Sequence, residues 1–271
     1  MIPLILIDVD GTLVGASGTV TEPVWEAVDK ALARGQHLAL STARGAFGSS
    51  WEMAKRLDPD GWHVFHAGGA IVHTGTEETR GHSLKRADVQ TLRDIEAADG
   101  NDAWALELYS ARAYAIEATT KAAVDHAALM GLAFEPTSFD SFLATHADIV
   151  RAQMVVPVAD IPKVHEEVDP LGLSVTSATS PIMPGTAFVS ITKPGITKAT
   201  GINSICEILG ITVDQVMMIG DGLNDLPAIE AVGHPVAMGN AADEVKERAT
   251  YIVADVDHDG VAEALALSAT L

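Results

Sequence analysis

The stretch Leu4-Ile5-Leu6-Ile7-Asp8-Val9-Asp10-Gly11-Thr12 holds an apolar run that stops abruptly at two acidic residues. A short run of this kind is typical of a strand that is covered on both faces, as in a parallel sheet. The period of two along an extended segment points the side chains of Asp8 and Asp10 the same way. Gly11 permits a sharp turn directly afterwards, and the Thr12 hydroxyl can steady it. The stretch therefore predicts two carboxylates at the end of a buried strand.

Short apolar runs of the same kind recur towards both ends of the chain, each followed by small or polar residues. They are His37–Leu40 before Ser41-Thr42, Val64-Phe65 before Gly68-Gly69, Val216–Ile219 before Gly220-Asp221, and Val236–Met238 before Gly239. Helical periodicity separates these runs, from Thr21 to Gly35 and from Ile202 to Gly210. Alternation of strand and helix with short connections is typical of a doubly wound α/β domain. We therefore expect a Rossmann-like core built on a parallel sheet.

The middle of the chain has a different pattern. Two alternating stretches, Ala103–Tyr109 and Arg112–Glu117, follow each other with no room for a helix between them, so they should pair antiparallel. Helical patterns at Ala87–Ala98 and Ala118–Met130 accompany them. This pattern predicts a separate α+β domain inserted into the first. The expected boundaries are residues 1–80 and 185–271 for the core and residues 81–184 for the insert.

The composition is that of an ordinary globular protein, with 48% hydrophobic and 20% charged residues among 271. The formal net charge of −20 would repel a nucleic acid backbone, and no basic stripe offsets it. No stretch reaches the roughly 18 apolar residues that a membrane helix needs, and no signal-peptide core precedes Asp8. We expect a soluble, cytoplasmic protein that binds a small molecule, without nucleic acid or membrane partners, as a monomer or a small homo-oligomer.

In an open parallel sheet, ligands bind beyond the carboxyl ends of the strands, because loops and helix N-termini meet at that edge. The residues that follow the expected strands include Asp8, Asp10, Thr42, Arg44, Asp221, Asn224 and Asp225. Four carboxylates at one edge would raise each other's pKa values unless a cation shared them. Because the available ligands are hard oxygens, Mg²⁺ is the expected ion and zinc is not.

These residue types suit phosphoryl transfer, which needs positioning and stabilisation of charge on the equatorial oxygens. Asp8 could attack phosphorus while Asp10 handles the proton, so that two easier steps replace one slow hydrolysis. Thr42 can donate to a phosphate oxygen, and Lys198, at the start of an expected helix, can place a positive charge beside the nucleophile. Taken singly, the acidic pair could be a solvated turn, Thr42 a strand-end cap and Lys198 a surface residue. Their joint order and spacing favour a catalytic site.

One acidic loop partly matches the sequence pattern of a calcium-binding site. Asp255–Gly260 matches the opening of a calcium-binding EF-hand loop, whose twelfth position should be Glu. That position is Ala266, inside an apolar helical run. We therefore interpret the loop as a polar cap of the last helix.

With these residues placed, the sequence resembles the haloacid dehalogenase superfamily of phosphatases at both ends of the chain. The matching residues are Asp8-Val9-Asp10-Gly11-Thr12 for its first motif, Thr42 for its second, Lys198 for its third and Gly220-Asp221-Gly222-Leu223-Asn224-Asp225 for its fourth. The insert resembles the type IIB cap of the Cof-like hydrolases. The resemblance implies that Asp8 and Asp221 bind Mg²⁺ through their side chains and Asp10 through its backbone carbonyl. It also implies that Asp225 steadies the waters of the metal and that Asn224 contacts phosphate or the nucleophile.

The chain departs from the family pattern at two places. The second motif reads Ser41-Thr42-Ala43-Arg44 where Thr-Gly-Arg is usual, which keeps the hydroxyl and the guanidinium. We therefore assign Thr42, Ala43 and Arg44 to phosphate or substrate binding. Ala67-Gly68-Gly69-Ala70 stands where the family often has Asn-Gly-Ala, so any ordering role of that Asn is lost or reassigned.

The expected function is Mg²⁺-dependent hydrolysis of a small phosphomonoester, such as a sugar phosphate, through an aspartyl-phosphate on Asp8. Phosphoryl transfer to another sugar hydroxyl, as in a mutase, fits the same motifs. A catalytically silent phosphate-binding regulatory protein is a third hypothesis, although such proteins would be expected to lose a catalytic residue. The identity of the substrate should depend on which side chains of the insert face the strand ends.

Overall fold

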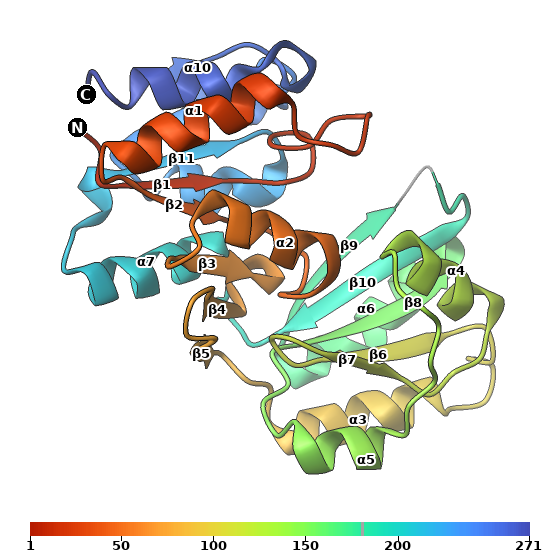
Figure 1. Cartoon of the computed structure of the whole chain (residues 1–271). Helices are drawn as coiled ribbons and strands as arrows, with labels where there is room; N and C mark the ends of the chain where they lie inside the picture. The colour runs from red at the N-terminus through yellow and green to blue at the C-terminus, as the bar shows by residue number, and fades with distance from the viewer. Residues whose placement is uncertain (180–181) are drawn as a thin grey trace. The chain divides into compact units, whose positions relative to one another are not determined.

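The computed structural model describes residues 1–179 and 182–271, and their contacts divide into two compact units (Figure 1). The core unit comprises Met1–Arg44, Trp51–Arg80 and Thr197–Leu271, and the cap unit comprises Gly45–Ser50 and the described part of Gly81–Ile196. The cap unit therefore runs past the expected boundary at residue 184. The reason is strand β10 (Thr186–Thr192), which is paired on both sides within the cap sheet.

The core unit is built on a five-stranded parallel sheet in the order β13, β12, β11, β1, β2. Its strands are β1 (Leu4–Ile7), β2 (His37–Leu40), β11 (Val216–Gly220), β12 (His234–Ala237) and β13 (Tyr251–Ile252). In β1, all four side chains are buried, and Ile7 is level with Leu40 on one side and Ile219 on the other. The expected α/β fold with a parallel sheet is confirmed.

Helices lie between and after these strands in the sequence, and the first three residues of α2 belong to the cap unit. They are α1 (Glu22–Ala33), α2 (Gly48–Leu57), α7 (Lys198–Leu209), α8 (Leu226–Ile229), α9 (Asp243–Arg248) and α10 (Gly260–Leu267). Helix α1 packs beside α10, and Figure 1 shows the two lying over the same face of the sheet. Thr21 occupies the N-cap position of α1, but its hydroxyl donates to Asp259 Oδ1 at 2.5 Å instead of capping the helix.

The segment around Val64-Phe65 does not extend the parallel sheet as a full strand. Strand β3 (Trp62–Phe65) pairs antiparallel with β4 (Ala70–His73), in a small sheet that ends with β5 (Thr79–Gly81). A single parallel bridge joins Val64 to Ser41, after the end of β2. The chain reverses direction because η1 (His66–Gly68) has positive φ angles throughout, which makes an antiparallel return possible.

The cap unit has a five-stranded antiparallel sheet in the order β7, β6, β8, β10, β9. Besides β10, its elements are α3 (Arg86–Glu96), β6 (Ala105–Tyr109), β7 (Tyr114–Ile116), α4 (Lys121–Leu129), α5 (Phe139–Thr145), β8 (Arg151–Pro157), α6 (Ile161–Val168) and β9 (Ser174–Thr179). The expected antiparallel pairing of the two alternating stretches is confirmed, with Tyr109 opposite Tyr114. On β6, Leu106 and Leu108 join the main hydrophobic cluster of the cap, so the period of two places Glu107 and Tyr109 on the opposite face.

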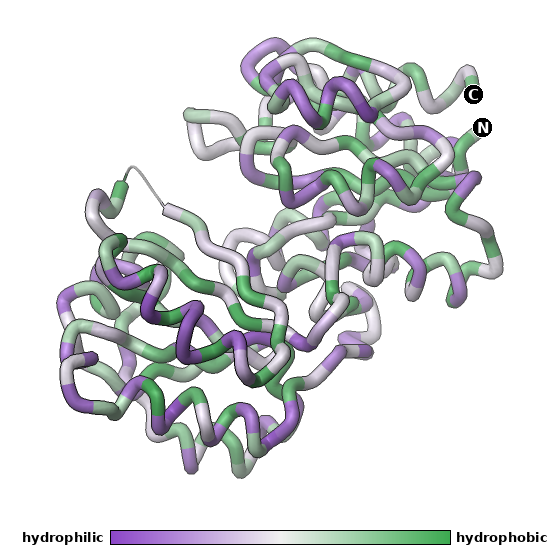
Figure 2. Tube along the Cα trace, turned by 180° about the vertical axis from the view of Figure 1, so that it is seen from behind, coloured by the Kyte–Doolittle hydropathy of each residue, from purple (hydrophilic) through white to green (hydrophobic). Residues whose placement is uncertain are grey.

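Hydrophilic and hydrophobic residues alternate along the helices in Figure 2, as expected when one face of a helix packs on a sheet. In the described part of the chain, none of the helices combines the length and the apolar character that a lipid bilayer requires of a spanning segment.

Candidate active site

The end of β1 delivers Asp8 to the carboxyl edge of the core sheet. The Asp8 N–H donates to the carbonyl of Ile219 at 3.0 Å, which continues the ladder between β1 and β11 by one residue. The side chain of Asp8 is buried. The chain then turns at Gly11, whose φ is +87° and where a Cβ would lie 2.3 Å from Asp221 Oδ2. Glycine is therefore required for this turn to pass so close to the Asp221 carboxylate.

Lys198 is the first residue of α7, and its side chain is fully buried against two carboxylates. Its Nζ lies 2.6 Å from Asp8 Oδ1 and 2.5 Å from Asp225 Oδ1. At the helix start, the hydroxyl of Thr200 accepts from the N–H of Thr197 at 3.2 Å, and the N–H of Thr200 donates to the Thr197 carbonyl at 2.9 Å. The helix start is fixed also by Gly68, where a Cβ would lie 1.9 Å from the Thr197 carbonyl oxygen. The ammonium of Lys198 is thus placed beside Asp8 by a backbone with little freedom to move.

The loop after β11 supplies two further carboxylates. Asp225, on η5 (Leu223–Asp225), uses its second oxygen to accept from the N–H groups of Asp221 (3.1 Å) and Gly222 (3.0 Å). Asp221 accepts from the hydroxyl of Thr12 at 2.7 Å. Asp225 therefore braces both Lys198 and the turn that carries Asp221.

The electrostatics of this cluster are dominated by burial. Burial raises the pKa of Asp8 to about 7, and the contact with Lys198 offsets part of this rise. Burial also raises the pKa of Asp221. For Lys198, burial opposes protonation, but the attraction of Asp8 and Asp225 outweighs it and raises the pKa of the ammonium. The cluster holds three carboxylates around one lysine, so it lacks positive charge.

The same cluster fits a divalent metal ion. Asp8, Asp221 and Asp225 offer carboxylate oxygens within 4.8 Å of one another, and the described residues contain no second group of His, Cys, Asp or Glu side chains of this kind. Hard oxygen donors suit Mg²⁺. Both oxygens of Asp225 are already engaged by Lys198 and by backbone N–H groups. Asp8 and Asp221 are therefore the side chains best suited to bind the ion directly.

The other residues expected at this edge lie in different settings. Thr42 is buried at the end of β2, and its Oγ1 accepts from the Arg44 N–H at 3.1 Å. Ala43 and Asn224 are exposed. The Asp10 side chain lies outside the group of three carboxylates and forms an ion pair with Arg44. Of the expected set, the structure thus joins Asp8, Lys198, Asp221 and Asp225 directly.

One residue that sequence reasoning did not assign braces this region. Asn240, after β12, donates from Nδ2 to the Gly11 carbonyl at 2.8 Å and accepts at Oδ1 from the Val256 N–H at 2.9 Å. It therefore ties the turn after β1 to the loop before α10. Its place directly after an expected strand and Gly239 was a usable signal.

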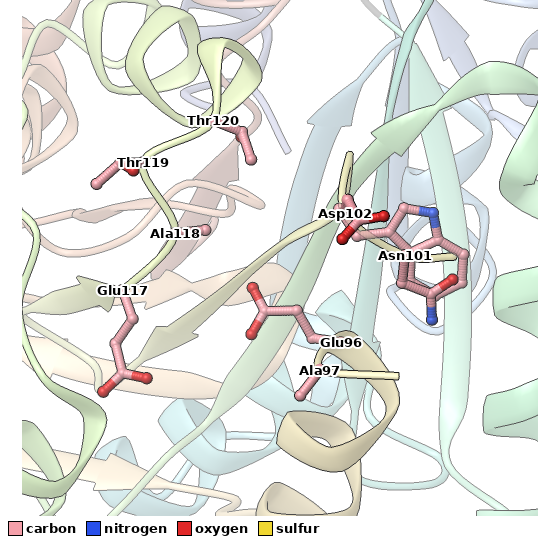
Figure 3. Close-up of a pocket in the computed structure, with 9 residues that line it drawn as sticks. Glu96, Ala97, Asn101, Asp102, Glu117, Ala118, Thr119 and Thr120 are labelled. Atoms are coloured by element: carbon pink, nitrogen blue, oxygen red, sulfur yellow. The ribbon is translucent and has the colours of Figure 1, made fainter. Parts of the chain in front are cut away.

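A shallow pocket of about 430 Å³ lies in the cap unit, but its chemistry is wrong for an anion (Figure 3). The carboxyl-bearing residues Glu96, Asp102 and Glu117 line it. Glu96 accepts from the Leu106 N–H and Glu117 from the Phe139 N–H, so both carboxylates hold the cap fold together. A phosphate ester would be repelled there, so this pocket is not a candidate active site.

Known proteins resemble this chain in sequence and in fold. A relative from Bacillus subtilis (strain 168), a 5-amino-6-(5-phospho-D-ribitylamino)uracil phosphatase, is 27% identical over 97% of this chain and 94% of its own. A haloacid dehalogenase-like hydrolase from Bacteroides thetaiotaomicron has a TM-score of 0.84 and 26% identity, over 98% of this chain and 99% of its own. A sugar phosphatase of haloacid dehalogenase subclass IIB shares the fold, with a TM-score of 0.79 and 21% identity over 99% of both chains.

The family itself is established by a match along nearly the whole chain. The sequence profile of the haloacid dehalogenase-like hydrolases matches residues 5–265. This match includes the Asp8 turn, Lys198 and the Asp221 loop. The chain therefore belongs to the haloacid dehalogenase-like hydrolases and is a phosphatase of that family.

Proposed function

We propose that this chain hydrolyses small-molecule phosphate monoesters in two steps, with Asp8 as the nucleophile. The observation that carries the proposal is the Asp8 carboxylate, buried at a strand end with Lys198 Nζ at 2.6 Å. A contact of this kind holds the nucleophile in place and supplies positive charge where negative charge develops on the phosphoryl group. The family of the chain supports the same reaction.

The proposed reaction needs one nucleophile and one proton carrier. In the first step, an Asp8 oxygen bonds to phosphorus while the bond from phosphorus to the leaving oxygen breaks, and Asp10 gives that oxygen a proton. In the second step, Asp10 takes a proton from water, and the water oxygen bonds to phosphorus while the bond to Asp8 breaks. Inorganic phosphate leaves, and the Asp8 carboxylate is restored.

The remaining residues of the proposed site bind and orient. Thr42, Lys198 and Asn224 would donate to phosphate oxygens, with Ala43 beside them in the loop after β2. The side chains of Asp8 and Asp221 and the backbone carbonyl of Asp10 would hold Mg²⁺, which neutralises phosphate charge when bound. Asp225 would act by fixing Lys198, with which it is in contact.

We propose a sugar phosphate or a similar small ester as the substrate class. The Bacillus subtilis relative carries a phosphorylated ribityl chain in the name of its substrate, which supports this class. The net charge of −20 disfavours long polyanions such as nucleic acids.

The test is phosphate release from a panel of sugar phosphates and related esters, with Mg²⁺ and with a chelator. We expect release with Mg²⁺, background release with the chelator, and loss of turnover in Asp8→Asn with folding intact. Asp214→Asn, at an exposed acid before β11, is the matched control and should keep full activity. Full activity of Asp8→Asn, or of chelated protein, would contradict the proposal, and product analysis separates free phosphate from an isomerised sugar phosphate.

A further inference from the structure

Arg44 donates hydrogen bonds from two nitrogens to the carboxylate of Asp10. Its Nε lies 3.0 Å from Asp10 Oδ2, and its Nη2 lies 2.5 Å from Asp10 Oδ1. Two parallel hydrogen bonds of this kind fix both the position and the plane of a carboxylate. The sequence predicts phosphate or substrate binding for Arg44, and the structure places its guanidinium in contact with Asp10.

The backbone of Arg44 is itself held at two points. Its N–H donates to Thr42 Oγ1 at 3.1 Å, and its carbonyl accepts from the N–H of His66 at 2.9 Å. His66 is fully buried in η1. The backbone that carries the guanidinium is therefore fixed, and the ion pair with Asp10 is in place before a substrate binds.

The ion pair between Arg44 and Asp10 contributes little to the stability of the fold. The side chains are 37% exposed for Arg44 and 64% exposed for Asp10, and exposed pairs contribute roughly 0–1 kcal/mol. What the pair does restrict is rotation of the Asp10 side chain, which is otherwise in solvent. A proton carrier misplaced by about 1 Å can lose about 100-fold in rate, so this restriction matters for catalysis.

We propose that Arg44 is a positioning residue that holds Asp10 for proton transfer. This inference rests on the proposed function, in which protonated Asp10 gives its proton to the leaving oxygen and the resulting carboxylate later takes one from water. The two-pronged contact with Arg44 belongs to that carboxylate form, and in the protonated form Arg44 can still donate to the oxygen that carries no proton. Arg44 exchanges no proton itself. Its effect should therefore follow how strongly a given substrate needs the proton from Asp10.

The test compares two substrates in Arg44→Gln by kcat/KM, which reports the steps through the first bond cleavage. A sugar phosphate leaves as an alkoxide and needs the proton, whereas p-nitrophenyl phosphate leaves as a stable phenolate and does not. We expect kcat/KM to fall about 100-fold for the sugar phosphate and to change less than about threefold for p-nitrophenyl phosphate. Arg44→Lys, which cannot form the two-pronged contact, should restore part of the loss at most.

Two further variants make the result specific. In an Asp10→Asn background, Arg44→Gln should cause no additional loss, because the group that it positions is gone. Arg56→Gln removes an exposed two-pronged pair with Asp29 elsewhere in the core unit and is the matched control, expected to leave both substrates unaffected.

Equal losses with both substrates would instead assign Arg44 to phosphate binding and overturn the inference, as would an unchanged rate with both. Failure of the proposed function is a separate outcome, since it appears as activity in Asp8→Asn whatever Arg44→Gln does.

Discussion

Two buried carboxylates, Glu107 in the cap unit and Asp8 in the core unit, differ in the hydrogen-bond partners and charges that surround them. Glu107 is fully buried on β6 and accepts from the hydroxyl of Tyr109 at 2.5 Å and the amide of Gln153 at 2.9 Å. Its other oxygen lies 2.7 Å from His126 Nδ1. Each oxygen of Glu107 thus has a partner.

Asp8 shares its lysine with a second carboxylate, and a third lies close by. Burial raises its pKa to about 7, which shows how poorly the folded protein alone supports its charge. A satisfied polar network stabilises a fold, whereas a surplus of one charge at a strand edge marks a place where a ligand completes the site. The comparison therefore assigns Glu107 to stability and Asp8 to chemistry.

The largest effect should come from Lys198→Met. It removes the cation that contacts both Asp8 and Asp225, so turnover should fall by at least about 1,000-fold. Thermal unfolding in chelator should show a loss of about 3 kcal/mol in the free energy of unfolding, because two carboxylates stay buried without the cation that they share. Lys30→Met, at an exposed lysine, is the control for both measurements. Turnover near the normal rate would refute the role given to Lys198.

A smaller and different effect is expected from Glu107→Ala. The free energy of unfolding should fall by about 3 kcal/mol, because the Tyr109, Gln153 and His126 groups lose their common acceptor. The kcat/KM of the folded protein should stay unchanged. Denaturant unfolding and kinetics on the same preparation check this, and Glu107→Gln should show a milder loss of stability. Lost turnover at full stability would mean that this network contacts the substrate and that the comparison fails.

How much of this could be predicted from sequence depends on the range of the interactions. Leu4–Ile7 and Val216–Ile219 were recognisable as strands because a short apolar run that stops at polar residues is a local signal. The parallel sheet of the core, and the carboxyl edge at which the acidic side chains lie, could be predicted from such runs. By contrast, the clamp of Lys198 between Asp8 and Asp225 joins residues 190 and 27 positions apart, and only the folded chain fixes such distances.

The missed cap boundary has a particular cause. The expected boundary at residue 184 leaves out Thr186–Thr192, which alternates between buried and half-buried side chains, the pattern of a strand in an antiparallel sheet. That alternation is present in the sequence and could have placed β10 in the cap. The pairing of Arg44 with Asp10 had no such signal, because the direction of a long side chain depends on its tertiary neighbours.

The most restricted effect is confined to one pH range and concerns a buried group that takes no part in the proposed chemistry. Burial lowers the pKa of His63 to about 4, and its ring links the Leu40 N–H to the Asp58 carbonyl. The unfolded chain binds this proton near pH 6.5, so the contribution of His63 to the free energy of unfolding should drop by about 3 kcal/mol between pH 6.5 and pH 4 and no further below it. The raised pKa of Asp8 acts in the opposite direction, so the contribution of His63 is read from the difference between the variant and the unchanged protein.

Denaturant unfolding at several pH values checks this prediction. His63→Gln should flatten the dependence in that window, whereas His165→Gln, at a half-buried histidine on α6, should not. An unchanged slope in His63→Gln would show that other groups carry the acid sensitivity.

The central claim, that Asp8 carries the phosphoryl group, is tested most directly by trapping the intermediate. Asp10→Asn should still be phosphorylated by p-nitrophenyl phosphate with Mg²⁺, because this leaving group needs no proton, but it should release phosphate slowly. After acid quenching and peptide mapping, we predict a phosphoryl group on the peptide that contains Asp8, and none in the Asp8→Asn/Asp10→Asn double variant. Release of nitrophenolate with no phosphorylated peptide, or with the label at another residue, would contradict the account.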